Sequence, residues 1–191
     1  FRFSSSQGCL VRGTPNRSER VWLRLTYSHD RHVFSPEVSI RFKAIEDVFH
    51  RSSGFEPKYH RGTQTLGACL SDLDSSLPPL LSIASSDGTK EAASLLLGAY
   101  PSVITPFFTR FPDIAAVDAY LNDDPVEPRV ARSMLWLRAS TAVIAAYLNQ
   151  NSALPTLAST YRGLVARDAY GFYLPAFDRL LADLALVPAG A

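Results

Sequence analysis

Two segments between Val21 and Phe42 alternate apolar and polar residues, and most of the chain after Phe42 repeats its apolar residues every three to four positions. The first spacing is typical of a β-strand with one covered face, and the second is typical of an amphipathic helix. Since the strand pattern comes first and the helical pattern then continues almost to the end, the sequence predicts an α+β fold. We expect an N-terminal antiparallel sheet, built as a meander, followed by a C-terminal bundle of antiparallel helices.

Polar turns separate the predicted strands. The clearest strands are residues 1–4, 8–12, 20–28 and 33–42, and weaker patterns at 63–70 and 79–84 indicate two more. In the strand at 20–28, one face carries Val21, Leu23, Leu25 and Tyr27, and the other carries Trp22, Arg24, Thr26 and Ser28. We expect the first face to be covered and the second to meet solvent. Pro36 cannot donate to a ladder, so its strand should lie at an edge or begin after it.

The helical pattern predicts a helix at 43–52 and further helices from about residue 86 onward. Pro101 and Pro106 interrupt the apolar stripe there, so we expect a break or a kink near Tyr100. Residues 112–121 and the apolar stripes at 130–148, 157–164 and 173–184 predict the remaining helices. We expect one domain over residues 1–191, with a β-rich part at 1–84 and a helical part at 85–191, because the apolar face of the sheet needs a cover.

Composition and charge narrow the class of protein. Of the 191 residues, 47% are hydrophobic and 11% aromatic, which is enough for a sizeable core. No run of about 18 uninterrupted apolar residues and no signal-peptide pattern occurs, so the sequence predicts a cytoplasmic protein without a membrane span. Residues 1–66 hold 11 Lys and Arg against 6 Asp and Glu, a balance of +5, and residues 67–191 hold 8 against 12, a balance of −4. This polarity can steer a charged partner, but it is far from the dense basic stripe of nucleic-acid-binding proteins.

Candidate reactive residues occur without a motif that joins them. They are His29, His32, His50 and His60, the acidic pairs Asp72 with Asp74 and Asp123 with Asp124, and the two cysteines Cys9 and Cys69. A metal site needs three or four converging ligands, aspartates in loops usually accept hydrogen bonds within turns, and thiols in apolar strands are usually inert. No nucleophile elbow and no glycine-rich phosphate loop is present. The sequence therefore predicts no catalytic residue, no metal ligand and no cofactor.

The polar face of the predicted sheet is the strongest candidate for binding. Trp22, Arg24 and Arg41 share it if their strands are neighbours, and Arg12 and Arg20 are expected to join them. Trp and Arg are enriched at the energetic centres of protein interfaces, and the same residues can stack on bases and contact phosphates. A plainer interpretation is that another part of the chain covers Trp22. We expect Trp22 to stand on solvent with these arginines around it.

A second group of the same residue types lies in the helical half. Arg129, Arg132, Trp136 and Arg138 fall largely off the apolar stripe at 130–148. On a helix with one apolar face, such residues are expected on the side that meets solvent. We predict a second contact surface there.

Two segments carry a resemblance to known proteins. They are VWLRLTYSHDRHVFSPEVSIRF and AYPSVITPFFTRFPDIAAVDAYL, and in the latter a helix with paired phenylalanines precedes a short second helix. Their order resembles small bacterial α+β proteins of unknown function, some of which look like immunity proteins encoded beside secreted toxins. The resemblance implies a non-enzymatic protein that binds and blocks one cognate toxin through complementary shape and charge.

These observations favour a cytoplasmic binding protein of immunity or antitoxin type that occludes a protein partner. The alternative is an RNA or single-stranded DNA binder that uses the same basic face. A third hypothesis is an enzyme with an atypical site around the four histidines.

Overall fold

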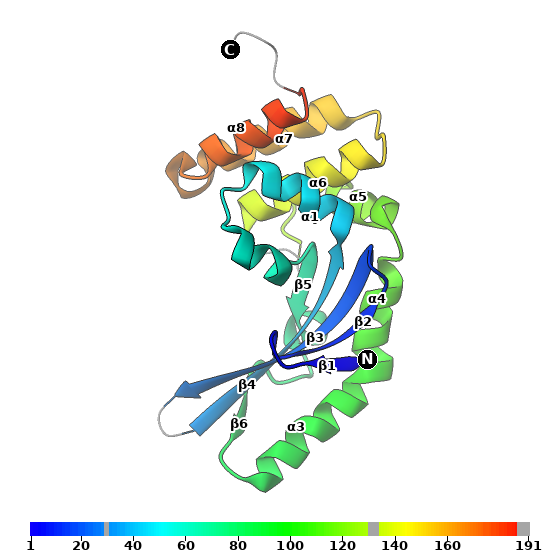
Figure 1. The fold of residues 1–191 in the computed structure, drawn as a ribbon, viewed down its shortest axis with the longest axis vertical. Coiled ribbons are helices and arrows are strands. Elements are labelled where there is room, and N and C mark those ends of the chain that lie inside the picture. The colour runs from blue at the N-terminus through cyan, green and yellow to red at the C-terminus, as the bar shows by residue number, and fades with distance from the viewer. Residues whose placement is uncertain (29–30, 130–133, 187–191) are drawn as a thin grey trace. The chain divides into compact units, whose positions relative to one another are not determined.

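The computed structural model describes residues 1–28, 31–129 and 134–186, and it confirms the α+β fold. An antiparallel sheet of six strands is followed by helices (Figure 1). The sheet has the order β1-β2-β3-β4-β5, and β6 also pairs with β4. Contacts divide the chain into two compact units: unit 1 is residues 1–41 and 66–111, and unit 2 is residues 42–65 and 112–191.

All six predicted strands are present. They are β1 (Arg2–Ser4), β2 (Cys9–Gly13), β3 (Arg17–Ser28), β4 (Arg31–Phe42), β5 (Leu66–Cys69) and β6 (Leu81–Ile83). β3 begins three residues earlier than predicted, because the turn before it is tight. The Thr14 N–H donates to the Arg17 carbonyl at 2.8 Å, and Gly13 supplies a φ of +133° that other residues rarely adopt.

Pro36 lies inside the sheet, so both expectations for its strand are wrong. β4 runs without interruption through Pro36 and has strands on both sides. On its outer side, β6 pairs with residues 32–34 and β5 pairs with residues 37–40. Pro36 falls between these two registers. Its missing N–H therefore costs the sheet no backbone hydrogen bond.

Unit 1 has one short helix between β5 and β6, and its other helices follow β6. They are α2 (Leu70–Leu73), α3 (Ser86–Ala99), η2 (Tyr100–Ile104) and α4 (Thr105–Arg110). Ser85 caps α3, since its side chain accepts a hydrogen bond from the Gly88 N–H. The interruption expected at Tyr100 takes the form of the π-helical turn η2, so the helix continues through Pro101 rather than breaking there.

One helical run among the described residues, Ser86–Arg110, is long and apolar enough to cross a membrane by length and composition alone. A third of its most apolar 18-residue stretch is buried inside the structure. The core helix of a soluble protein passes the same test, so this single helix is compatible with a soluble protein.

Unit 2 contains α1 (Lys43–Ser52), η1 (Pro57–Gly62), α5 (Ile114–Asn122), α6 (Leu135–Leu148), α7 (Leu154–Arg167), η3 (Asp168–Gly171) and α8 (Leu174–Asp183). α1 has the predicted bounds. The central helix is α6, which packs against α1, α5, α7 and α8 and is buried at every position from Ala139 to Ala146. Four alanines in this stretch let neighbouring helices approach closely. Val130, part of the predicted stripe, lies outside the described residues, and Met134 is exposed.

The two units do not follow the predicted division of the chain at residue 84. The sheet shares its unit with α3 and α4, and α1 shares the other unit with α5 to α8. The organisation of all 191 residues as one domain stays a prediction.

Tyr161 is fully buried in unit 2, and its Oη donates a 2.7 Å hydrogen bond to the Leu121 carbonyl. Burial raises the pKa of Tyr161 to about 12. Tyr161→Phe should cost about 1 kcal/mol at pH 8, the usual worth of one hydrogen bond.

The control for this prediction is the pH dependence of the stability difference between the wild type and Tyr161→Phe. A phenol whose pKa is raised in the folded state contributes stability below its unfolded pKa of about 10, and this contribution is lost as pH rises toward 12. Urea unfolding between pH 8 and 11.5 should therefore show the advantage of the wild type over Tyr161→Phe shrinking above pH 10. A constant difference would contradict this assignment.

Candidate binding surface

Trp22 is buried rather than solvated, with 8% of its surface exposed, so the expectation that its indole stands on solvent is wrong. Its Nε1 donates to Ser39 Oγ on β4 at 2.7 Å. The guanidinium carbons of Arg20 and Arg24 lie 5.7 and 5.4 Å from the centre of the ring. Residues two apart on a strand are neighbours on one face, so both arginines fold over the indole between them.

The other predicted members of this surface divide between the two faces of the sheet. Arg20 is on the Trp22 face but is buried, and Arg41 is half-buried on the face of Ser39. Arg12 pairs in register with Glu19, one position away from Arg20. Because neighbouring positions point to opposite faces, Arg12 does not share the Trp22 face, and that part of the prediction is wrong.

Arg24 is the most exposed residue on the Trp22 face among the predicted set, with 55% of its side chain on solvent. Its Nε lies 3.3 Å from Glu37 Oε2 on β4. The guanidinium is thus positioned between an indole ring and a carboxylate. An arginine held in this way has already lost much of the rotamer freedom that a mobile arginine loses on binding.

The outer half of β3, residues 24–27, is here called the distal β3 segment. β2 pairs with β3 only over Ser18–Trp22, and the last bond on that side runs from the Leu23 N–H to the Gly8 carbonyl. Beyond this point Leu25 is 58% and Tyr27 65% exposed. Both were expected on a covered face, and they are exposed because β3 extends past the neighbouring strand.

Arg12 belongs to a structural cluster on the other face. It forms an ion pair with the buried Glu19, which also pairs with Arg17, and the hydrogen bond to Glu19 raises the pKa of Arg12. Arg17 Nη2 donates to the carbonyls of Phe108 and Phe111 at 2.9 and 3.1 Å. These are the carbonyls at the end of α4, so the cluster caps that helix and joins it to the sheet.

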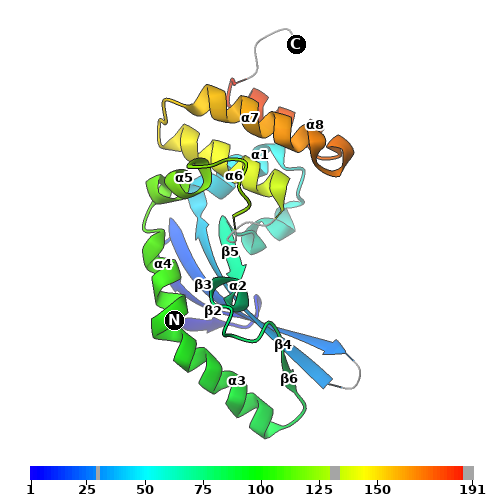
Figure 2. The ribbon, with the colours of Figure 1, turned by 180° about the vertical axis from the view of Figure 1, so that it is seen from behind.

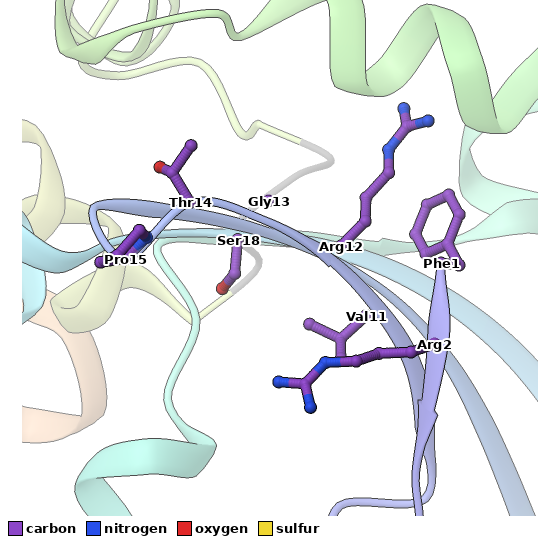
Figure 3. A pocket seen from close by; sticks show the side chains of 8 residues that line it. All are labelled: Phe1, Arg2, Val11, Arg12, Gly13, Thr14, Pro15 and Ser18. Carbon is purple, nitrogen blue, oxygen red and sulfur yellow. The ribbon is translucent and has the colours of Figure 1, made fainter.

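An open depression of about 590 Å³ lies beside β1 and β2. In Figure 3, Phe1 and Arg12 point to one side of the strands, and Arg2 and Val11 point to the other. The polar groups around it therefore do not converge on one ligand position, as a binding pocket requires.

Compared with known protein families, curated proteins and solved structures, the chain matches none.

The structure brings two of the four predicted histidines together. His50 and His60 in unit 2 stack with ring centres 3.8 Å apart. Thr63 Oγ1 donates to the His60 carbonyl, so the 2.9 Å contact between His50 Nε2 and this hydroxyl requires His50 to donate. Glu46 Oε2 lies 3.8 Å from His50 Nε2, which is beyond hydrogen-bond distance. The pair is thus ordered by neighbouring hydroxyl and carbonyl groups rather than aimed at a ligand.

Of the other two predicted histidines, the structure describes His32 alone. His32 lies in unit 1 with its ring 5.3 Å from that of Tyr27, and His29 is outside the described residues. Within residues 1–28, 31–129 and 134–186, no group of three or more His, Cys, Asp or Glu is placed to hold a metal ion.

The acidic loops and the cysteines have ordinary structural surroundings. Asp74 accepts hydrogen bonds from the N–H and hydroxyl of Ser76, which lower the pKa of Asp74, and Asp124 accepts from the backbone of the next turn. Burial raises the pKa of Cys9 and of Cys69, so both are held as thiols rather than as nucleophilic thiolates.

The prediction of a second contact surface in the helical half is wrong for the members of that group that the structure describes. Trp136 is buried and stacks on Tyr173, with ring centres 5.0 Å apart. Arg138 is also buried and donates to the carbonyls of Glu127 and Pro125. Arg129 is largely buried, and Arg132 lies outside the described residues. α6 is covered on nearly all sides, so a residue off its apolar stripe is not on solvent.

Proposed function

We propose that this chain is a non-enzymatic binding protein of immunity or antitoxin type, which acts in the cytoplasm by covering a site on one protein partner. The observation that carries the proposal is the distal β3 segment, which is exposed on both faces. One face presents Arg24, and the other presents Leu25 and Tyr27. Large apolar or aromatic side chains exposed beside an arginine are typical of the centre of a protein interface.

Trp22 has a supporting role in this proposal. Its ring and the Glu37 carboxylate hold Arg24 in one place, and Ser39 fixes the indole. A preordered arginine loses less side-chain entropy when a partner binds, which favours affinity.

The burial of Trp22 also bears on the nucleic-acid alternative. A base stacks on an exposed aromatic face, whereas two guanidinium groups lie over this indole. The platform on which that alternative depended is therefore covered, and the observations favour a protein partner.

The proposal is tested by capturing a partner from a lysate of the source organism on the immobilised full chain, identifying it and measuring its affinity for the purified chain. We expect one protein to bind in solution, and Tyr27→Ala to weaken binding at least tenfold, about 1.4 kcal/mol. Tyr59→Ala is the matched control, since Tyr59 in η1 is 57% exposed, and it should leave the affinity unchanged.

Two outcomes would overturn the proposal. One is a partner whose affinity falls equally in both tyrosine variants. The other is recovery of no protein, together with binding of a single-stranded oligonucleotide that weakens steeply between 50 and 200 mM salt, as phosphate contacts require.

A further inference from the structure

A second depression in unit 1 is lined by the end of α2 and by the helical run of η2 and α4. We infer that it binds a lysine residue of another polypeptide, with the lysine ammonium group on the Asp74 carboxylate and the alkyl chain along an apolar wall. This site shares no residue with the distal β3 segment, so the inference goes beyond the proposed function.

The walls of this depression come from two elements that pack against each other. α2 packs against η2, and Figure 2 shows α2 and the run from α3 to α4 from behind. One wall is Leu73, Asp74 and Ser75, and the other consists of residues of η2 and α4 between 102 and 110. The volume is about 450 Å³, within the range of ligand sites in proteins. The depression beside β1 and β2, by contrast, is formed by a single ribbon of strands.

The apolar wall is fixed in the core of unit 1. Val103 and Phe107 are 7% and 5% exposed, and Leu73 and Pro106 complete the apolar surface. The long alkyl chain of a lysine packs on such a surface while its charged end stays in water. Val103 also lies in the π-helical turn η2, and turns of this kind are frequent at functional sites.

Asp74 supplies a fixed negative charge. The Ser76 N–H and hydroxyl donate to its Oδ1 at 2.9 and 2.7 Å, and these bonds lower the pKa of Asp74, so the carboxylate is ionised at neutral pH. Its backbone is held as well, since the Asp74 N–H donates to the Leu70 carbonyl at 2.9 Å. Oδ2 has no hydrogen-bond or ion-pair partner in the part of the chain that the structure describes. One oxygen of an ordered carboxylate is therefore left to accept from a ligand.

The hydrogen-bonding groups favour an ammonium group over a guanidinium group. A guanidinium pairs best with both oxygens of a carboxylate, but Oδ1 of Asp74 already accepts two bonds. An ammonium group is a point charge that needs one oxygen and has further donors to spare. Ser102 Oγ donates to the Gly98 carbonyl at 3.3 Å, so its oxygen still has lone pairs to accept with. These acceptors suit lysine rather than arginine.

The local charge has the sign that a cation requires. Residues 66–111 hold one Lys and one Arg against four Asp and Glu, a balance of −2. Arg110 also lines the depression, and its guanidinium carbon lies 5.6 Å from the centre of the Phe111 ring. Because Arg110 has the same charge as the expected ligand, Arg110→Gln should tighten binding rather than weaken it.

A capped pentapeptide with one lysine between alanines is the probe, titrated into the isotope-labelled full chain and followed by backbone amide NMR signals. We expect saturable shifts at Ser75 and Ser102. The same peptide with norleucine keeps the alkyl chain but loses the charge, and it should bind about tenfold more weakly or worse. The arginine peptide should also bind more weakly than the lysine peptide. These comparisons change only the probe, so they do not depend on the fold of a variant.

Asp74→Asn is the variant that tests the carboxylate. Its amide oxygen can still accept from Ser76, so the turn is retained, and the lysine peptide should lose about tenfold in affinity or more. Asp72→Asn is the matched control, because Asp72 lies two residues earlier on α2 and does not line the depression. This control should leave the affinity unchanged.

Equal loss in the two aspartate variants, or equal affinity of the lysine and norleucine peptides, would overturn the inference. So would the absence of saturable shifts up to about 10 mM peptide. Binding that survives Asp74→Asn but is lost in Arg110→Gln would also overturn it, since the ligand would then be an anion. None of these outcomes bears on the proposed function, because the probe is a defined peptide and the distal β3 segment is unchanged in every variant.

Discussion

Asp118→Ala should lower the free energy of unfolding by about 3 kcal/mol. Asp118 on α5 is 2% exposed, and its carboxylate accepts hydrogen bonds from three asparagine amides. Asn122 and Asn149 donate at 2.6 and 2.7 Å, and Asn151 donates to both oxygens at 3.1 and 3.0 Å. Alanine would leave these part-buried amides without their acceptor, and urea unfolding followed by circular dichroism measures the cost.

Asp123→Ala is the control for this prediction. Asp123 ends the same helix, but 82% of its side chain is exposed, and its nearest cation, Arg129, is 3.6 Å away. Exposed ion pairs contribute little, so this variant should stay within about 0.5 kcal/mol of the wild type. Equal destabilisation by the two substitutions would show that Asp118 does not act through its buried hydrogen bonds.

The parts of the fold that follow from local pattern were predictable. The change of period after Phe42 marks the end of β4 and the start of α1, and both boundaries agree with the structure. Pro101 indicated the irregular turn in the long helix of unit 1. Such features depend on residues within one or two turns of each other, and this is the information that periodicity carries.

The candidate surface was less predictable because burial depends on neighbours that are distant in sequence. Alternation placed Trp22 and Tyr27 on opposite faces of β3 correctly, but it reversed their exposure. Trp22 is covered by arginine side chains and bonded to Ser39, and Tyr27 is exposed because β2 ends before reaching it. One signal was available: the predicted strand at 8–12 is shorter than the one at 20–28, so the latter had to extend beyond it.

The structural cluster on the other face, by contrast, gave no sequence signal. Arg12 was expected beside Trp22, and only the register of β2 with β3 shows that it faces Glu19. The contacts between Arg17 and the end of α4 span more than 90 residues. Neither a motif nor a spacing predicts such pairs, because they depend on how the helix returns to the sheet.

Glu19→Ala should destabilise unit 1 by about 2 to 3 kcal/mol. Glu19 is buried and neutralises Arg12 and Arg17, so its removal leaves two cations beside an apolar helix without their common carboxylate. The expected loss is smaller than that for breaking a fully buried pair, because the side chains of Arg12 and Arg17 are 41% and 22% exposed. Thermal unfolding followed by circular dichroism, with urea titration of the same samples, measures the change.

Glu37→Ala is the matched control, since Glu37 also pairs with an arginine of β3 but at the more exposed position of Arg24. It should cost less than about 1 kcal/mol. A double-mutant cycle then separates capping from charge: if Glu19 holds Arg17 against the α4 carbonyls, Arg17→Ala should cost less in the Glu19→Ala background than in the wild type. Purely additive losses would show that the two residues stabilise unit 1 independently, and the helix cap would then not depend on the carboxylate.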